Sequence, residues 1–129
     1  MNKILVEVSV GELLDKISIL EIKQEKIKDT EKLKFINNEL SILKDQLENN
    51  IKYDDKLKKL YQSLKEINSK LWLIEDEKRL CEKEKDFGDK FIKLSRDVHF
   101  LNDDRAKIKL EINNHTGSKI KEIKEYTKY

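Results

Sequence analysis

Apolar side chains recur at alternating steps of three and four residues along most of the chain, as they do in helices that pack along one face. The clearest run spans residues 57–81, and a second run over residues 91–112 keeps the same seven-residue repeat. An earlier run over residues 13–47 changes phase near Asp29 and Thr30. The pattern predicts an all-α fold of long antiparallel helices with coiled-coil-like heptad seams.

Capping and turn residues divide these runs into elements. Ser9 and Glu12 form a Ser-x-x-Glu capping box, which predicts a helix start at residue 10. The phase change at Asp29 fits either a shift within one helix or a short break. Gly88 favours a turn, although a continuous helix through it would keep the heptad phase. We expect one domain over residues 1–129, with helices at approximately residues 10–48, 55–86 and 89–114.

The two ends of the chain follow another pattern. Residues 4–10 alternate β-branched and other side chains, which predicts a short extended segment. Residues 119–129 fit either a frayed helix or a strand that pairs with residues 4–10. We favour the strand.

Composition restricts the class of protein. Charged residues make up 42% of the chain and hydrophobic residues 37%, with three glycines and no proline, a profile typical of long helices. The 28 basic residues are nearly balanced by 26 acidic ones, so we expect no nucleic-acid partner. No apolar run reaches the roughly 20 residues that span a bilayer, so we expect no membrane insertion. Cys81 is the only cysteine, which excludes an intrachain disulfide and favours a cytoplasmic location.

All three arginines lie in the second half of the chain, where a turn at Gly88 would bring them near facing acids. Arg105 occupies a seam position, and a buried guanidinium is costly unless it is paired, so we expect Glu75 or Asp103 as its partner. The cluster fits a buried salt-bridge network that fixes helix register, or alternatively a pocket for an anionic ligand. The candidate ligand-binding residues are Trp72, Glu75, Arg79, Arg96, Asn102, Asp103 and Arg105.

Signatures of catalysis are absent from the sequence. It has no phosphate-binding glycine loop, no nucleophile elbow and no Cys-x-x-Cys pair, so we assign no catalytic residue and expect no cofactor. His99 and Asp103 share a helix face, but two ligands are too few for a metal site.

The seams therefore predict a non-enzymatic structural or adaptor protein, a helical bundle that acts through protein–protein interaction. Broad apolar stripes that contain Leu14, Ile42, Leu73 and Leu110 would stay partly exposed in a monomer. We therefore expect a homodimer or higher oligomer, together with another protein as partner. The alternative is a small anionic-ligand binder or enzyme that uses the arginine and acid cluster.

Three stretches resemble an uncharacterised family of short helical bacterial and phage-encoded proteins. They are VEVSVGELLDKISILEIK at residues 6–23, LWLIEDEKR at residues 71–79 and FIKLSRDVHFLNDDRAKIKLEIN at residues 91–113, followed by Gly117 and Ser118. The resemblance covers most of the chain. It implies a helical protein and transfers no catalytic residue, although some relatives occur beside sugar-transfer or surface-polysaccharide functions.

Overall fold

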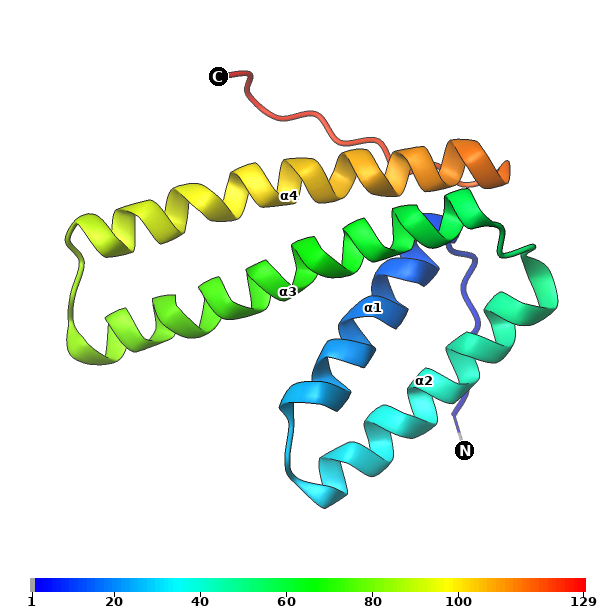
Figure 1. Cartoon of the computed structure of the whole chain (residues 1–129), viewed down its shortest axis with the longest axis horizontal. Coiled ribbons are helices and arrows are strands. Elements are labelled where there is room, and N and C mark those ends of the chain that lie inside the picture. The colour runs from blue at the N-terminus through cyan, green and yellow to red at the C-terminus, as the bar shows by residue number, and fades with distance from the viewer. Residues whose placement is uncertain (1) are drawn as a thin grey trace.

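The computed structural model describes residues 2–129 and contains four α-helices. They are α1 (Val10–Lys26), α2 (Thr30–Asn50), α3 (Asp55–Glu84) and α4 (Asp89–Thr116). Figure 1 shows α3 and α4 as a long antiparallel hairpin, with α1 and α2 folded as a shorter hairpin against one end of it. The all-α prediction is confirmed. None of the described helices is long and apolar enough to cross a membrane.

Three of the four described helices begin after a side chain that satisfies a free backbone N–H group, whereas Gly88 before α4 makes no such bond. Ser9, Asp29 and Asp54 each accept a hydrogen bond from the backbone three residues onward, as N-caps do. The Ser9 cap confirms the predicted helix start. Glu12 does not complete the capping box, because its carboxylate faces Lys109 instead, at 2.7 Å.

The phase change at Asp29 is a break between two helices, so a single element over residues 10–48 was wrong. Ile27 leaves the helical conformation with ψ of 132°, and Asp29 starts α2 two residues later. The predicted turn at Gly88 is confirmed, since α3 ends at Glu84 and α4 begins at Asp89. Lys85 ends α3 with a φ of 56°, in the left-handed region.

The hydrophobic core lies where α1 packs between α2 and the hairpin. α1 contacts all three other helices, whereas α2 contacts only α1 among the described helices. Leu14 is fully buried in this core, so its expected exposure was wrong. The core residues are Leu14, Ile17, Leu20, Ile36, Leu40, Leu57, Leu64 and Ile112.

The other end of the α3–α4 hairpin extends beyond α1 and α2 (Figure 1). We call this part, residues 71–101, the distal arm. Only Cys81 and Leu94 among its apolar side chains are buried. Large apolar side chains remain exposed on it, including Leu73, Leu80 and Ile92. Apart from the tail, which packs on His99 and Phe100, the arm therefore depends on contacts between its two helices.

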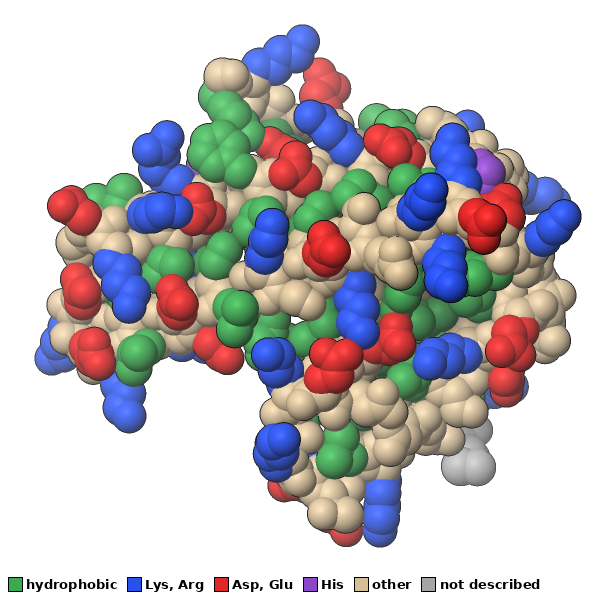
Figure 2. Space-filling view, in the orientation of Figure 1, with side chains coloured by type: hydrophobic (Ala, Val, Ile, Leu, Met, Phe, Trp, Pro, Cys, Tyr) green, Lys and Arg blue, Asp and Glu red, His purple; other side chains and the backbone are tan. Residues whose placement is uncertain are grey.

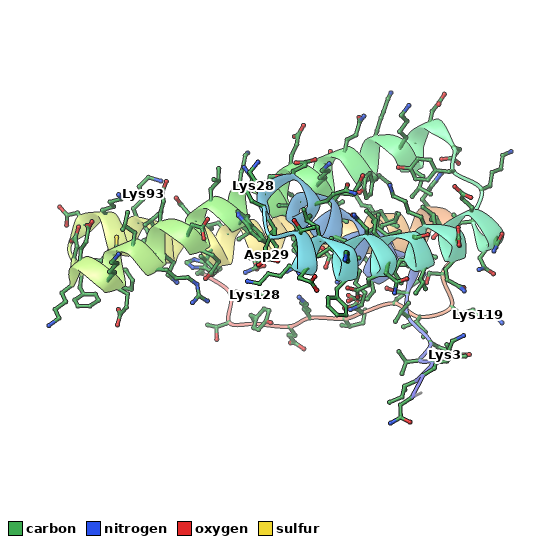
Figure 3. The ribbon with its side chains drawn as sticks, turned by 90° about the horizontal axis from the view of Figure 1, so that it is seen from below. Lys3, Lys28, Asp29, Lys93, Lys119 and Lys128 are labelled. Atoms are coloured by element: carbon green, nitrogen blue, oxygen red, sulfur yellow. The ribbon has the colours of Figure 1, made fainter. Side chains whose placement is uncertain are left out.

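Both chain ends lack regular secondary structure. The described residues contain no strand, so the expected strand at residues 119–129 was wrong. The tail instead runs back along α4, where the Tyr129 hydroxyl donates to Asp103 and its ring packs against His99 and Phe100. In Figure 3, Lys119 and Lys128 mark the two ends of this path, and Lys3 stands away from the helices.

Gly11 marks a close approach of α1 to α4. A Cβ atom at this position would lie 2.7 Å from the backbone oxygen of Lys109 and 3.0 Å from Oδ1 of Asn113. The Lys109 backbone and the buried Asn113 amide have little room to move away from an added Cβ atom. The small residue thus lets the two helices come together.

We predict that Gly11→Ala lowers the free energy of unfolding by about 1–3 kcal/mol, because it overpacks this contact. Gly88→Ala is the matched control, since its added Cβ would meet only the Asp86 carboxylate, at 3.4 Å. Its cost should stay near or below about 1 kcal/mol, the scale of an N-cap preference. Urea unfolding followed by circular dichroism measures both. Equal losses in the two variants would contradict the close-approach interpretation.

Candidate functional site

A polar stripe on α1 faces the α3–α4 hairpin. Gly11, Asp15 and Ser18 are buried at steps of four and three residues, and the apolar Ile22 continues the same line. These steps place all four residues on one face of the helix. α1 therefore buries two faces, an apolar one in the core and this polar one against the hairpin.

Asp15 and Arg105 form the centre of the site. The Asp15 side chain is only 2% exposed, and that of Arg105 is 27% exposed. Arg105 Nε donates to Asp15 Oδ1 at 2.9 Å, and Nη2 donates to Oδ2 at 2.5 Å. This is the bidentate geometry that lysine cannot supply. The expected partners, Glu75 and Asp103, were wrong, because the acid comes from α1.

Asn68 on α3 provides a further hydrogen bond to Asp15. Its Nδ2 donates to Asp15 Oδ1 and to Ser18 Oγ, both at 2.8 Å. Ser18 Oγ in turn donates to the backbone oxygen of Asp15 at 2.7 Å. The network therefore joins α1, α3 and α4 through buried side chains.

Lys109 extends the network one turn along α4. Its side chain is 8% exposed, and Nζ lies 2.7 Å from Glu12 Oε2, 3.8 Å from Asp15 Oδ2 and 3.3 Å from Glu122 Oε1. Two cations, Arg105 and Lys109, thus face three carboxylates. The cluster contains one more carboxylate than it has cations, so it has no surplus positive charge.

The ionisation of these groups follows from the geometry. Burial alone would raise the pKa of Asp15, but hydrogen bonds from Arg105 and Asn68, with the positive charges of Arg105 and Lys109, lower it below its ordinary value. Burial would lower the pKa of Lys109, and the contacts with Glu12, Asp15 and Glu122 outweigh that effect and raise it. Asp15, Arg105 and Lys109 are therefore all charged at neutral pH.

The two chain ends meet beside this cluster. Ser118 Oγ accepts from the Val10 backbone N–H at 3.2 Å, and Ser9 Oγ donates to Glu122 at 3.1 Å. Asn113 Oδ1 accepts from the Gly11 N–H at 2.7 Å. The first N–H groups of α1 are thus occupied, so its N-terminus offers no anion site.

The sequence-predicted residues are mostly dispersed. Asn102 alone joins Arg105, accepting from Nη1 at 3.4 Å. Glu75 and Arg79 are exposed, and Trp72 is half-buried on the distal arm. Arg96 lies over the Phe100 ring, with its guanidinium carbon 5.9 Å from the ring centroid. Asp103 binds the Tyr129 hydroxyl.

Residues outside the predicted set carry most of the contacts. A polar stripe at helical spacing was the missed signal: Gly11, Asp15 and Ser18 on α1, with Arg105, Lys109 and Asn113 at four-residue steps on α4. Such a stripe beside an apolar seam indicates a second buried face. The missed residues are Glu12, Asp15, Ser18, Asn68, Lys109, Asn113 and Glu122.

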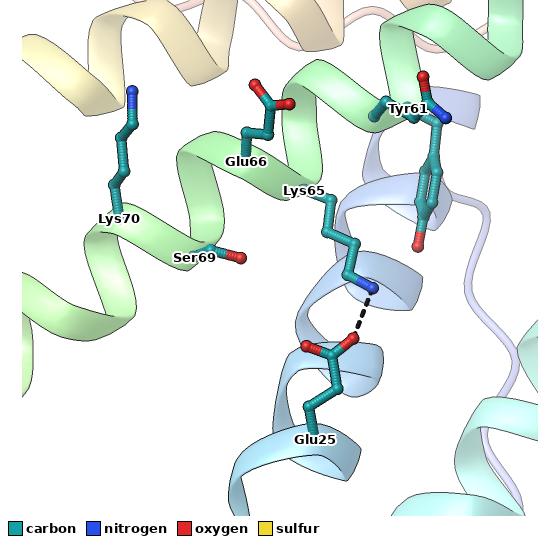
Figure 4. Close-up of a pocket in the computed structure, with 7 residues that line it drawn as sticks. Glu25, Tyr61, Lys65, Glu66, Ser69 and Lys70 are labelled. Atoms are coloured by element: carbon teal, nitrogen blue, oxygen red, sulfur yellow. Dashed lines mark hydrogen bonds and ion pairs between the residues drawn. The ribbon is translucent and has the colours of Figure 1, made fainter.

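Another concave surface is a shallow groove between α1 and α3. It has a volume of about 610 Å³, and its side chains include Tyr61, Ser69 and Lys70. Figure 4 shows Lys65 bridging to Glu25 across it, at 2.8 Å. The Tyr61 hydroxyl is buried without a hydrogen-bond partner among the described residues. Within residues 2–129, no three His, Cys, Asp or Glu side chains gather as metal ligands would.

We predict that Arg105→Met lowers the free energy of unfolding by about 3 kcal/mol, because it leaves Asp15 charged and buried without its main partner. The double variant Asp15→Leu with Arg105→Met should recover most of that loss, since well-packed apolar pairs often replace buried ion pairs at little cost. Arg79→Met, on an exposed side chain, is the control and should change stability by no more than about 0.5 kcal/mol. Urea unfolding of the three variants distinguishes the results. A single-variant loss below about 1 kcal/mol would contradict the buried pair.

The lowered pKa of Asp15 also predicts a dependence of stability on pH. A group whose pKa is lower in the folded state stabilises the fold above its unfolded value near 4, and loses that contribution as pH falls through the folded value. Wild-type stability should therefore fall below about pH 4, and Asp15→Asn should show a smaller change over pH 7 to 2.5. Thermal unfolding across this range measures the difference. If stability falls equally with pH in wild type and Asp15→Asn, Asp15 does not cause the loss of stability at low pH.

Comparison with known proteins identifies a family and supplies no activity. Neither the curated proteins nor the solved structures contain a match to this chain. The model of a family of unknown function, DUF6165, matches residues 4–129, which is nearly the whole chain. The chain therefore belongs to the DUF6165 family.

Proposed function

We propose that this chain is a non-enzymatic helical protein that acts by binding another protein through its distal arm. The observation that carries the proposal is the pair Leu73 and Leu80 on α3, which are 51% and 46% exposed. They lie seven residues apart, or about 10.5 Å along the helix axis, and so occupy one stripe. Exposed apolar side chains in such a stripe are typical of interaction sites.

The surroundings of the two leucines suggest the kind of partner. Asp76 and Glu77 lie between them, Glu84 follows one turn later, and all three are exposed. Figure 2 shows hydrophobic side chains along the line between α3 and α4 on one face, with charged side chains around them. An amphipathic helix with apolar residues at heptad spacing and basic flanks would complement this stripe.

The buried charge cluster supports a structural role for the arginine rather than a ligand site. Asp15 already occupies Arg105, and Lys109 already faces Glu12, Asp15 and Glu122. An anionic ligand, such as a nucleotide sugar, would have to displace a carboxylate before it could bind. The ligand-binding alternative stays a prediction that no observed contact favours.

We predict that the double variant Leu73→Lys with Leu80→Lys weakens partner binding at least about 10-fold, as loss of central apolar anchors does. Ile42→Lys on α2 is the matched control, because Ile42 is 53% exposed and lies away from the arm. Affinity capture followed by mass spectrometry identifies the partner, and titration calorimetry with the purified partner measures binding. Added salt should weaken the contacts of Asp76, Glu77 and Glu84 with a basic partner.

Three results would contradict the proposal. They are binding of the arm variant with wild-type affinity, an equal loss of binding in the Ile42 control, and no binding of any purified partner to the wild-type chain. Circular dichroism of each variant shows whether the helices are retained, so that loss of binding is not confused with unfolding.

A further inference from the structure

The segment of residues 4–8 is the most exposed apolar stretch of the protein. Ile4, Val6 and Val8 are 84%, 74% and 41% exposed, and Leu5 is 83% exposed. The exposed fraction falls toward Ser9, where the chain joins the cap of α1. The segment thus leaves the folded body and carries β-branched side chains that favour a strand.

No part of the described chain supplies a strand partner for this segment. Residues 2–129 contain no strand, and the segment has no backbone hydrogen bond to another part of the chain. The tail, expected as its partner, meets the N-terminal region at Ser9 and Val10 and then follows α4 (Figures 1 and 3). A strand partner must therefore come from another molecule, because an unpaired apolar strand is a template for association.

We infer that residues 4–8 pair antiparallel with the same segment of a second copy and so form a homodimer. Centring the pairing on Val6 places Ile4 opposite the second copy's Val8, and Val6 opposite its own equivalent. All six β-branched side chains then share one face of the ribbon, because side chains alternate along a strand. A two-fold axis through Val6 makes the contact self-complementary.

The charges of the segment agree with this register. Lys3 and Glu7 lie on the opposite face of the strand from Val6. Antiparallel pairing about Val6 places Lys3 diagonal to the second copy's Glu7, at about 7–8 Å between backbones, within reach of long side chains. The two-fold axis repeats this pair. Parallel in-register pairing would instead align Lys3 with Lys3 and Glu7 with Glu7, which like charges disfavour.

The ribbon lies outside the helices, so its formation needs no rearrangement of the bundle. A two-stranded ribbon alone is only marginally stable, so the dimer should dissociate on dilution. The dimer would carry two distal arms, and it does not depend on which protein those arms bind.

The test uses opposite charges at the two-fold position of the full-length chain. Val6→Lys and Val6→Glu each place like charges directly opposite one another, so each variant alone should remain monomeric. An equimolar mixture should restore the dimer, because lysine then faces glutamate. Light scattering over a concentration series should give wild-type chain approaching twice 15.4 kDa at the high end. The matched controls are Ile123→Lys and Ile123→Glu, because Ile123 lies in the tail and is 80% exposed. Both should dimerise like wild type.

Several outcomes would overturn the inference. They are a wild-type chain that stays monomeric at every concentration, a single Val6 variant that still dimerises, a mixture that fails to restore the dimer, and an equal loss in the Ile123 controls. The double variant at Leu73 and Leu80 should keep its dimer mass. Dimer mass and partner binding are therefore separate readouts, and either proposal can fail without the other.

Discussion

The contact between Asp15 and Arg105 is the constraint on which the arrangement of helices depends. A carboxylate that is 2% exposed can remain charged only where cations and donors surround it, and Arg105, Asn68 and Lys109 come from the two helices of the hairpin. These partners converge at one level, so α1 can meet the hairpin in one register. Apolar packing alone would tolerate slippage along such regular helices. The charged group thus gives α1 its position, and the core around Leu14 supplies the apolar contacts.

Periodicity was sufficient to predict the helices but not their three-dimensional arrangement. The α3–α4 hairpin followed from its heptad spacing and Gly88, because both helices are adjacent in the chain and the turn fixes which residues face each other. The position of α1 could not be predicted in this way, because the face that packs on the hairpin is polar and an apolar pattern does not mark it. Arg105 was recognised as anomalous because it interrupts a seam. Its partner lies 90 residues earlier, and no local spacing relates the two.

The same physical reason explains why the predicted site dispersed. Glu75, Arg79 and Arg96 lie on the distal arm, several turns from the level of Arg105 and beyond the part of the hairpin that α1 reaches. The acid that pairs with Arg105 comes from α1, so these residues take no part in the cluster. The tail shows a related effect, because Glu122 and Tyr129 hold it along α4 rather than beside residues 4–8.

The molecule thus has a well-packed centre, and the distal arm and the N-terminal segment are more exposed. At the centre, three helices share buried charges and most of the core. The distal arm has two helices and two buried apolar side chains, Cys81 and Leu94, and the N-terminal segment is exposed. The arm and the N-terminal segment carry the exposed apolar side chains on which the two proposals rest.

Native-state hydrogen exchange tests most directly whether the structure depends on the junction of α1, α3 and α4. Amides near the network, at residues 14–22 and 105–113, should exchange only through global unfolding, and those of residues 71–84 and 91–101 should open locally at lower free energy. In Arg105→Met, protection of α1 should fall toward that of the arm. Equal or greater protection of the arm in the wild-type chain would contradict the account.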